Sequence, residues 1–317
     1  MYIKDLREGE KVSEIFLCRK KEVGQNSKSH DEYFALDLVD KTGSIDGKVW
    51  NTKSPGIQEF EAGDYIEVNG FVKSFNQRLQ IHIDKIRVCR EGEYDPGDFL
   101  MSSSKEIPAM YRELMAIIKT VNTKWLSELL NNVFILDKTV AKAFSEHSAA
   151  KQIHHAFRGG LLEHTLSVTK NCIGFAENYK FLNRDLLLTA AMLHDIGKIS
   201  ELSDLPENDY TDEGQLLGHI YMGAEYVGKK IDEIDGFPKK LRNELLHCIL
   251  AHHGKLEFGS PKKPALAEAL ALSMADDLDA KMETMSELFD NAAGDPTGWL
   301  GFQKNFESNV RKTGNYE

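Results

Sequence analysis

Seven histidine and aspartate side chains in apolar stretches constrain the fold of this 317-residue chain more than any other feature. They are His164, His194, Asp195, His219, His252, His253 and Asp276. Burying so many polar side chains is costly unless something pairs them, and a metal ion is the natural partner of imidazole and carboxylate groups. Successive positions lie about one helix and its connection apart, which predicts a helical bundle around one inward-facing site.

The apolar periodicity around individual histidines supports this inward placement. His164 lies four residues before Val168, on the apolar side of a predicted helix. Another predicted helix opens at Pro238, presents His252 on its apolar face and stops at Gly254. We therefore expect different helices to deliver these side chains to one centre.

A third predicted helix carries the dipeptide His194-Asp195. It covers Leu186–Lys198, is apolar nearly all round, and has Asp185 as its predicted N-cap. We therefore expect this helix to be buried.

Each of these residues also has a simpler interpretation when it is taken alone. A single buried histidine is more often a hydrogen-bonded core residue than a ligand, and the acidic run from Asp276 to Asp279 could be a solvated helix end. The joint occurrence of all seven favours the metal site. The outer pair His154 and His155 lacks the same context and is predicted to be flanking or solvent-facing structure.

The order of these residues resembles a known family. His164, the segment His194–Lys198 with the sequence HDIGK, and Asp276 resemble the HD superfamily of metal-dependent phosphohydrolases over about residues 150–285. His219 with the pair His252-His253 resembles the subset that holds a second metal. The whole chain is similar to the YhaM-type 3′-to-5′ exoribonucleases, in which an oligonucleotide-binding (OB) domain precedes the HD domain.

The N-terminal segment reads as a small β-barrel. Five strands are predicted, at Val12–Val23, Tyr33–Leu38, Gly43–Trp50, Tyr65–Phe75 and Leu79–Val88. Helical patterns follow at Met110–Thr120, Lys124–Val133 and Lys138–Glu146. We therefore expect a multidomain α and β protein, in which a five-stranded OB-type barrel precedes an all-α HD helical bundle.

The expected division of the chain has four parts. They are an OB domain over residues 1–90, a turn-rich polar linker over 91–105, a helical HD domain over 106–290 with its motif core at 150–285, and a tail over 291–317. The tail receives no predicted role.

Composition restricts the cellular setting and the partners. No apolar run approaches the roughly 20 residues of a membrane span, and the first residues lack a signal-peptide core, so we expect a cytoplasmic protein without a membrane partner. The four cysteines are widely spaced and indicate neither a zinc finger nor a disulfide framework. Residues 1–90 carry 15 basic and 15 acidic side chains, so the net charge of −11 arises downstream. Any grip on nucleic acid must therefore come from local features.

The predicted barrel supplies such features. OB barrels bind single strands by stacking bases on aromatic rings and by guiding phosphates with basic side chains. Candidate platforms are Phe34, Trp50, Phe71 and Phe75, and candidate basic contacts are Arg19, Lys20, Lys21, Lys48, Lys73 and Arg78. An aromatic on a strand is often a core residue, so the sequence does not choose among them. Lys73, Phe75 and Arg78 are selected because the segment between them resembles an exposed hairpin tip.

The candidate ligands suit a two-metal site. Asp195 can bridge two cations, with His164, His194 and Asp276 completing one site and His219, His252 and His253 the other. Two such cations can activate a shared hydroxide and clamp phosphoryl oxygens during in-line hydrolysis. Mixed imidazole and carboxylate ligation suits Mn²⁺, Fe²⁺, Co²⁺ or Ni²⁺, and the family resemblance implies Mn²⁺.

Lys198 and Arg158 complete the predicted catalytic set as phosphate contacts, although either could be an ordinary surface charge. The resemblance implies a 3′-to-5′ exoribonuclease acting on single-stranded RNA. Activity on single-stranded DNA and homo-oligomer formation stay open. An HD-type nucleotide or cyclic-dinucleotide phosphodiesterase and a noncatalytic single-strand-binding protein are the alternatives, and the segment after His253 departs from that of the HD-GYP phosphodiesterases.

Overall fold

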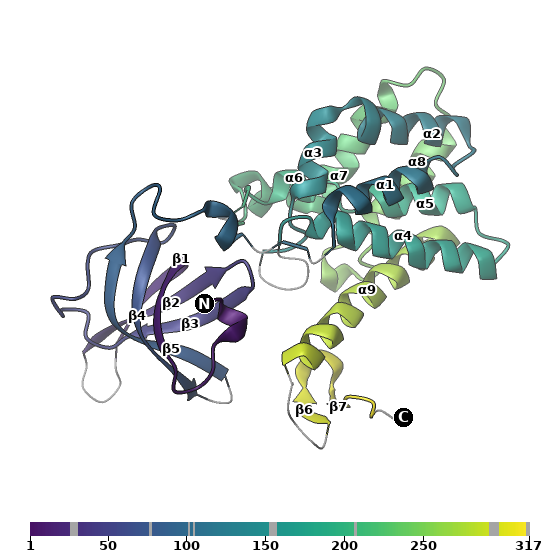
Figure 1. Cartoon of the computed structure of the whole chain (residues 1–317). Coiled ribbons are helices and arrows are strands. Elements are labelled where there is room, and N and C mark those ends of the chain that lie inside the picture. Colours follow the sequence, from purple (N-terminus) through teal and green to yellow (C-terminus); the bar gives the residue numbers. More distant parts are fainter. Residues whose placement is uncertain are drawn as a thin grey trace.

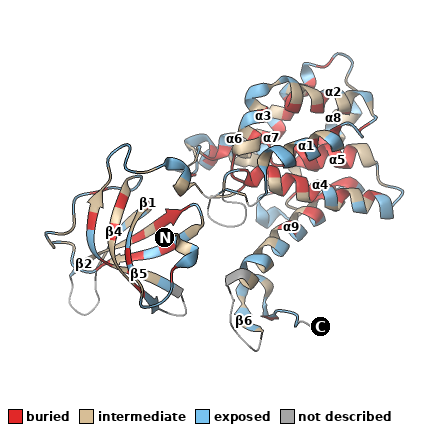
Figure 2. Ribbon diagram, viewed as in Figure 1, coloured by how far each residue is buried: buried red, intermediate tan, exposed pale blue. Residues whose placement is uncertain are grey.

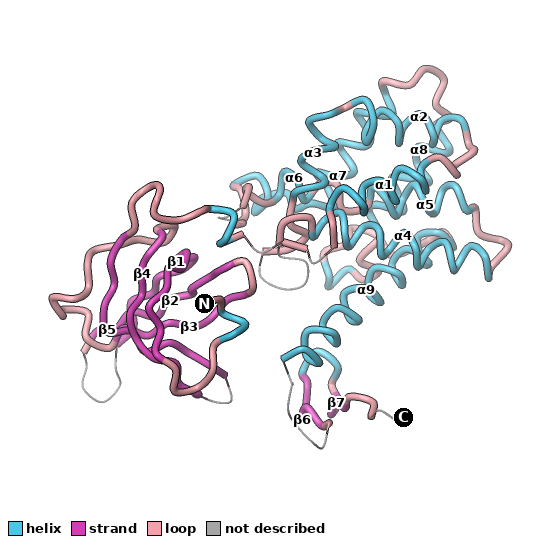
Figure 3. Tube along the Cα trace, in the orientation of Figure 1, coloured by secondary structure: helices cyan, strands magenta, loops and turns pink. Residues whose placement is uncertain are grey.

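The chain forms a β-barrel followed by a helical bundle, as seen in a computed structural model (Figure 1). The structure describes residues 1–25, 31–75, 78–100, 102–103, 105–151, 157–205, 208–291 and 298–314. The barrel and the bundle are separate bodies joined by the segment around the 3-10 turn Pro96–Phe99 (Figure 3). This arrangement confirms the predicted fold class.

The barrel is closed by five strands in the order β1-β2-β3-β5-β4. They are β1 (Lys11–Gln25), β2 (Glu32–Asp40), β3 (Gly43–Val49), β4 (Tyr65–Phe75) and β5 (Arg78–Val88). Only the pairing of β3 with β5 is parallel among these neighbours. Alternate residues such as Leu36 and Leu38 point into the core, where they meet Ile66 and Ile81. The opposite faces of the strands are therefore available to solvent.

Part of the segment after the barrel packs onto its outer surface. Phe99 is buried with Leu17 and Val39, and the ring of Tyr94 stacks on Tyr65 with 3.8 Å between the ring centroids. The side chain of Asp98 accepts a bond from the ammonium group of Lys41. These contacts attach residues 94–99 to the barrel.

The bundle consists mainly of nine α-helices within the described part of the chain. They are α1 (Ile107–Ile118), α2 (Lys124–Asn131), α3 (Lys138–Glu146), α4 (Gly160–Asn178), α5 (Arg184–Leu193), α6 (Lys198–Glu201), α7 (Asp212–Asp232), α8 (Lys239–Leu250) and α9 (Ala267–Asn291). A π-helical turn, Asn132–Leu136, extends α2. Residues of α5 from Leu186 to Leu193 are all buried, so this helix is the centre of the bundle (Figure 2).

The structure corrects the predicted limits of this central helix. Its N-cap is Asn183, whose side chain accepts a bond from the backbone N–H of Leu186. Asp185 lies in the first turn instead, where its carboxylate accepts bonds from the backbone N–H groups of Asn122 and Thr123. The helix ends at Leu193, and the dipeptide His194-Asp195 lies in the turns before α6.

The last described segment continues from α9. This helix extends beyond the bundle, and a two-stranded sheet of β6 (Trp299–Gln303) and β7 (Ser308–Arg311) lies beyond its C-terminal end (Figure 1). None of the helices in the described ranges is both long and apolar enough to cross a bilayer.

Candidate metal centre and nucleic-acid surface

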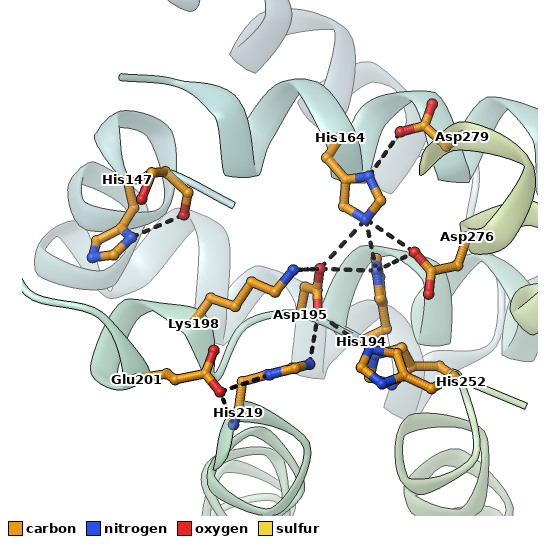
Figure 4. Close-up of polar contacts among 12 residues, drawn as sticks. His147, His164, His194, Asp195, Lys198, Glu201, His219, His252, Asp276 and Asp279 are labelled. Atoms are coloured by element: carbon orange, nitrogen blue, oxygen red, sulfur yellow. Dashed lines mark hydrogen bonds and ion pairs between the residues drawn. The ribbon is translucent and has the colours of Figure 1, made fainter. Parts of the chain in front are cut away.

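The seven predicted ligand residues converge from different elements, and Figure 4 labels all of them except His253. α4 supplies His164, the turns after α5 supply His194 and Asp195, and the middle of α7 supplies His219. His252 and His253 follow the end of α8, and Asp276 comes from α9. The long spacing in sequence thus becomes proximity through helix packing.

One group of ligand atoms contains His164, His194 and Asp276. Nε2 of His164 lies 3.2 Å from Nε2 of His194 and 3.2 Å from Oδ1 of Asp276. Nε2 of His194 lies 3.9 Å from the same Asp276 oxygen. Three donor atoms at such distances could hold one divalent cation.

A second group contains His219, His252 and His253, with one nitrogen from each ring within 4.8 Å of the others. His252 is buried, whereas His219 and His253 are half-buried. This second group therefore lies nearer to solvent than His194, whose side chain is completely buried.

Asp195 lies between the two groups and turns one carboxylate oxygen to each. Its Oδ2 is 3.4 Å from Nε2 of His164 and 3.3 Å from Nε2 of His194. Its Oδ1 is 3.5 Å from Nε2 of His219 and 3.6 Å from Nε2 of His252. A carboxylate so placed can serve two cations at once.

Unpaired buried atoms support this fit to metal ions. Among the described residues, Oδ1 of Asp195 and Nε2 of both His219 and His252 are buried without a hydrogen-bond partner. Such orphaned polar atoms are costly in a protein interior. All three point to one place, and a cation there would satisfy them.

The ring nitrogens facing away from the centre are all engaged. Each of the five histidines uses its Nδ1 in a hydrogen bond of 2.7–2.9 Å. The acceptors are the carboxylates of Asp279 for His164 and Glu201 for His219, and the backbone carbonyls of Ala191 for His194, Ile249 for His252 and Phe258 for His253. Because Nδ1 donates in these bonds, Nε2 of each ring is left to face the centre.

The electrostatic environment matches a site built for positive charge. Burial would lower the pKa of His164, but its contacts with Asp195, Asp276 and Asp279 raise that pKa well above its usual value. Burial would raise the pKa of Asp195, but Lys198 and His194 hold it well below its usual value. Burial lowers the pKa of His252, which keeps its ring neutral and able to bind a metal.

The two predicted phosphate contacts lie in different places. The ammonium nitrogen of Lys198 lies 2.7 Å from Oδ2 of Asp195, inside the cluster. The Arg158 guanidinium pairs instead with the carboxylate of Glu146, 2.8 Å away. The pair His154 and His155 lies outside the described residues.

Two carboxylates at the site were not selected from the sequence. Asp279 is only 8% exposed and lies one turn after Asp276, which excludes a fully solvated end for this acidic run. That spacing was the available signal. Glu201 carries no comparable signal, because its approach to His219 depends on how α6 packs against α7.

Aromatic and basic side chains gather on the outer face of the barrel. Lys48 of β3, His82 of β5 and Phe71 of β4 stand opposite one another on neighbouring strands. The rings of Tyr33 and Trp50 lie beside this row, with their centroids 4.9 Å apart. Lys48 lies over the Tyr33 ring, and Lys73 lies over that of Phe71. We call the set Tyr33, Lys48, Trp50, Phe71, Lys73 and His82 the barrel aromatic surface.

Not every barrel residue named from the sequence joins this surface. Phe34 packs partly into the core beside Phe60, and Lys21 donates to the carbonyl of Phe60, so neither is a free platform or phosphate contact. Arg19 pairs with Asp37, and Lys20 pairs with Glu22.

The predicted contact set at the hairpin tip is only partly described. Phe75 is 62% exposed, and Lys73 is exposed as well. The Arg78 side chain lies outside the described residues, as do Asn76 and Gln77. Tyr33 and His82 were not selected from the sequence. The signal was their alternation with inward-facing residues, which are Phe34 beside Tyr33 and Ile81 and Ile83 beside His82.

Two family models match parts of this chain. Residues 161–281 match the family model of the HD domain, and residues 17–89 match that of the OB-fold nucleic acid binding domain. The chain therefore carries an OB-fold domain followed by an HD domain, and the HD domain indicates a metal-dependent phosphohydrolase.

Two solved structures are similar to parts of the chain. A domain of replication protein A from Methanococcus maripaludis is 28% identical, with 28% of this chain and 92% of that chain covered and a TM-score of 0.24. The HD domain of the Listeria monocytogenes phosphodiesterase PgpH is 16% identical, with 51% and 75% covered and a TM-score of 0.28.

Proposed function

We propose that this chain, in which an OB-fold domain precedes an HD domain, is a metal-dependent 3′-to-5′ exoribonuclease that hydrolyses single-stranded RNA. The position of Asp195 carries the proposal, because its two oxygens face two separate groups of imidazole nitrogens. Such a centre suits two divalent cations and phosphodiester hydrolysis. The preference for Mn²⁺ and the 3′-to-5′ direction rest on the resemblance of the sequence to YhaM-type enzymes.

The protein residues have separate roles in this proposal. His164, His194 and Asp276 would hold one cation, His219, His252 and His253 would hold the other, and Asp195 would serve both. When bound, the cations polarise phosphoryl oxygens and lower the pKa of water. Lys198 keeps Asp195 ionised and brings a positive charge to the place where a phosphate group would enter. Arg158 binds RNA phosphates farther from the centre, if it leaves Glu146.

The barrel aromatic surface supports single-stranded nucleic acid as the substrate class. Exposed or half-buried aromatic rings on an outer face, flanked by lysines, suit bases and phosphates without selecting a sequence. The adjacent tip residues Lys73, Phe75 and Arg78 extend this contact in the proposal. RNA held on the barrel would then supply its 3′ end to the metal centre.

A labelled-strand assay tests the proposed activity. Wild-type protein with Mn²⁺ should shorten a 5′-labelled single-stranded RNA one nucleotide at a time, giving a ladder of products that retain the label. A 3′-phosphorylated RNA of the same sequence tests the requirement for a free end. The variant Asp195→Asn keeps the size of the side chain but loses the bridging charge, so it should bind RNA and leave it intact.

Other outcomes identify the alternatives. Immediate release of a labelled mononucleotide would mean the opposite direction. Turnover of a cyclic dinucleotide without any cleavage of RNA would mean a nucleotide phosphodiesterase. Binding without turnover at any Mn²⁺ concentration would mean a single-strand-binding protein. A matched DNA strand measures the preference for RNA.

A further inference from the structure

Helix α7 contains a backbone break directly before His219. Gly218 has φ of 73° and ψ of 153°, a conformation open essentially only to glycine. In an unbroken helix the N–H of His219 would bond to the carbonyl oxygen of Gln215, four residues earlier. The break frees this N–H and changes the direction in which the imidazole leaves the helix.

Glu201 occupies both hydrogen-bonding groups that this break presents. Its Oε1 accepts the backbone N–H of His219 at 2.9 Å and the ring Nδ1–H of the same residue at 2.9 Å. The side chain is mostly buried, and contact with His219 holds its pKa below the usual value despite the opposing effect of burial. Figure 4 shows this carboxylate on the side of the His219 ring that faces away from Asp195.

The backbone around Glu201 is held as closely as its side chain. The carbonyl of Glu201 accepts the N–H of Thr211 at 2.9 Å, and Gly214 approaches so near that a Cβ there would collide with this carbonyl. The end of α6 is therefore packed against the first turn of α7. Glu201 thus has little freedom to move away from His219.

We propose that Glu201 is the positioning residue of the second cation site, because it holds the break at Gly218 and aims Nε2 of His219 at Asp195. This inference rests on the proposed two-metal function. It predicts that the second ion, held by His219, His252 and His253, is lost before the first when Glu201 is changed. Replacing a carboxylate that orients a metal-binding histidine typically lowers the metal affinity by about 10- to 100-fold.

The first site offers a matched control. Asp279 accepts the Nδ1–H of His164 at 2.7 Å, so it has the same relation to the first group that Glu201 has to the second. Glu201→Gln should lower the affinity for the second ion by about 10- to 100-fold and leave the affinity for the first unchanged. Asp279→Asn should lower the affinity for the first ion and leave that for the second unchanged. If each variant loses only its own ion, the loss in either variant is a local effect and not a general failure to bind metal.

The measurement uses the full chain loaded with Mn²⁺ alone. A titration with Mn²⁺, monitored by electron paramagnetic resonance, distinguishes a coupled pair of ions from a single ion. Elemental analysis gives the number of ions that the protein retains. In the metal-free protein, nitrogen NMR of His219 reports whether Nδ1 carries the proton, a property that depends on the bond to Glu201. Glu201→Gln should shift this signal, and thermal unfolding should show that the variant is folded.

A second variant tests the role of the backbone break at Gly218 without changing Glu201. Gly218→Ala disfavours the backbone break, so it should also release the second ion first. Two ions retained with unchanged affinity in a folded Glu201→Gln protein, or loss of both ions together, would overturn the role of Glu201 while leaving the proposed hydrolysis intact. A wild type that never binds more than one ion would overturn the inference together with the two-metal form of the proposed function.

Discussion

Lys198 brings a permanent positive charge into a cluster of imidazole and carboxylate groups. Burial alone would lower the pKa of its ammonium group, but the nearby carboxylate of Asp195 raises it above the usual value. The lysine therefore stays charged with only 15% of its side chain exposed. The same contact lowers the pKa of Asp195 and keeps its carboxylate ionised.

Replacing this charge should mainly affect turnover. We expect Lys198→Met to lower kcat on RNA by about 10²- to 10³-fold, as when a single donor to a developing negative charge is removed. Lys229→Met is the matched control, because Lys229 is 69% exposed and pairs only at the surface of α7. Steady-state kinetics with metal analysis checks the result, and a parallel loss of Mn²⁺ from Lys198→Met would instead assign the lysine to metal retention.

The metal-free protein should respond to pH through His164. Since the folded-state pKa of His164 is raised above the usual 6.5, its stabilising contribution is fully present below about pH 6.5 and is lost as pH rises through the raised value. The pKa values of Asp195 and Asp276 are lowered, so the stabilisation that these two carboxylates provide is lost only at acidic pH. We therefore expect the Tm of chelator-treated protein to fall as the pH rises above about 6.5.

The variant His164→Gln isolates this contribution. Its Tm should change less over the same pH range, because the titrating ring is gone. Excess Mn²⁺ should also flatten the profile of the wild type, since metal binding takes the place of the proton. Equal slopes for the metal-free wild type and His164→Gln would exclude His164 as the titrating group.

Among the elements, the turns between α5 and α6 depend on a close approach to α7. A Cβ on Gly197 would collide with the carbonyl oxygen of His219 and lie 2.6 Å from the backbone nitrogen of Gly223. Both contacts are with backbone, which cannot rotate away. A glycine at this position lets the segment that carries Asp195 lie directly against the helix that carries His219.

This contact predicts opposite effects of the same substitution at two glycines. Gly197→Ala should lower the free energy of unfolding by about 1–3 kcal/mol through overpacking. Gly174→Ala should raise it by about 0.5–1 kcal/mol, because Gly174 lies within α4 with open space around it. Urea unfolding of the metal-free proteins provides both values. An unchanged free energy of unfolding in Gly197→Ala would mean that α7 can shift to make room for the methyl group at no cost in stability.

At the scale of the whole molecule, the barrel carries the proposed RNA-binding surface and the bundle carries the candidate metal centre. Trp50 and Phe71 belong to the barrel aromatic surface, whereas every candidate metal ligand belongs to the bundle. Each body has its own hydrophobic core, so a surface change on the barrel need not disturb the metal centre.

This division predicts a selective defect. The double variant Trp50→Ala with Phe71→Ala should raise KM for a long single-stranded RNA by at least about 10-fold, since stacking contributes about 1–3 kcal/mol per base. Its kcat on a small chromogenic phosphodiester should not change. Phe181→Ala, at a 75% exposed residue of the bundle, is the control. Equal KM values for the wild type and the double variant would remove the barrel aromatic surface from RNA capture.

The sequence by itself was sufficient to predict the fold class and to select the seven histidine and aspartate side chains that converge, but not Asp279 or Glu201 beside them. Its signals are local: alternation marks strands, apolar periodicity marks helices, and a polar side chain such as His164 stands out on an apolar face. The prediction that Arg158 contacts phosphate is still untested, and its pairing with Glu146 could not be read from the chain.

Only the tertiary structure decided how the histidines are oriented. Whether Nδ1 of His219 meets a carboxylate depends on the packing of α6 against α7 and on the break at Gly218, and neither is a local property. The same holds for Tyr33 and Trp50, which approach through the pairing of β2 with β3. Sequence patterns report which side chains prefer burial, whereas hydrogen-bond partners between distant segments are set by distances that exist only after the chain has folded.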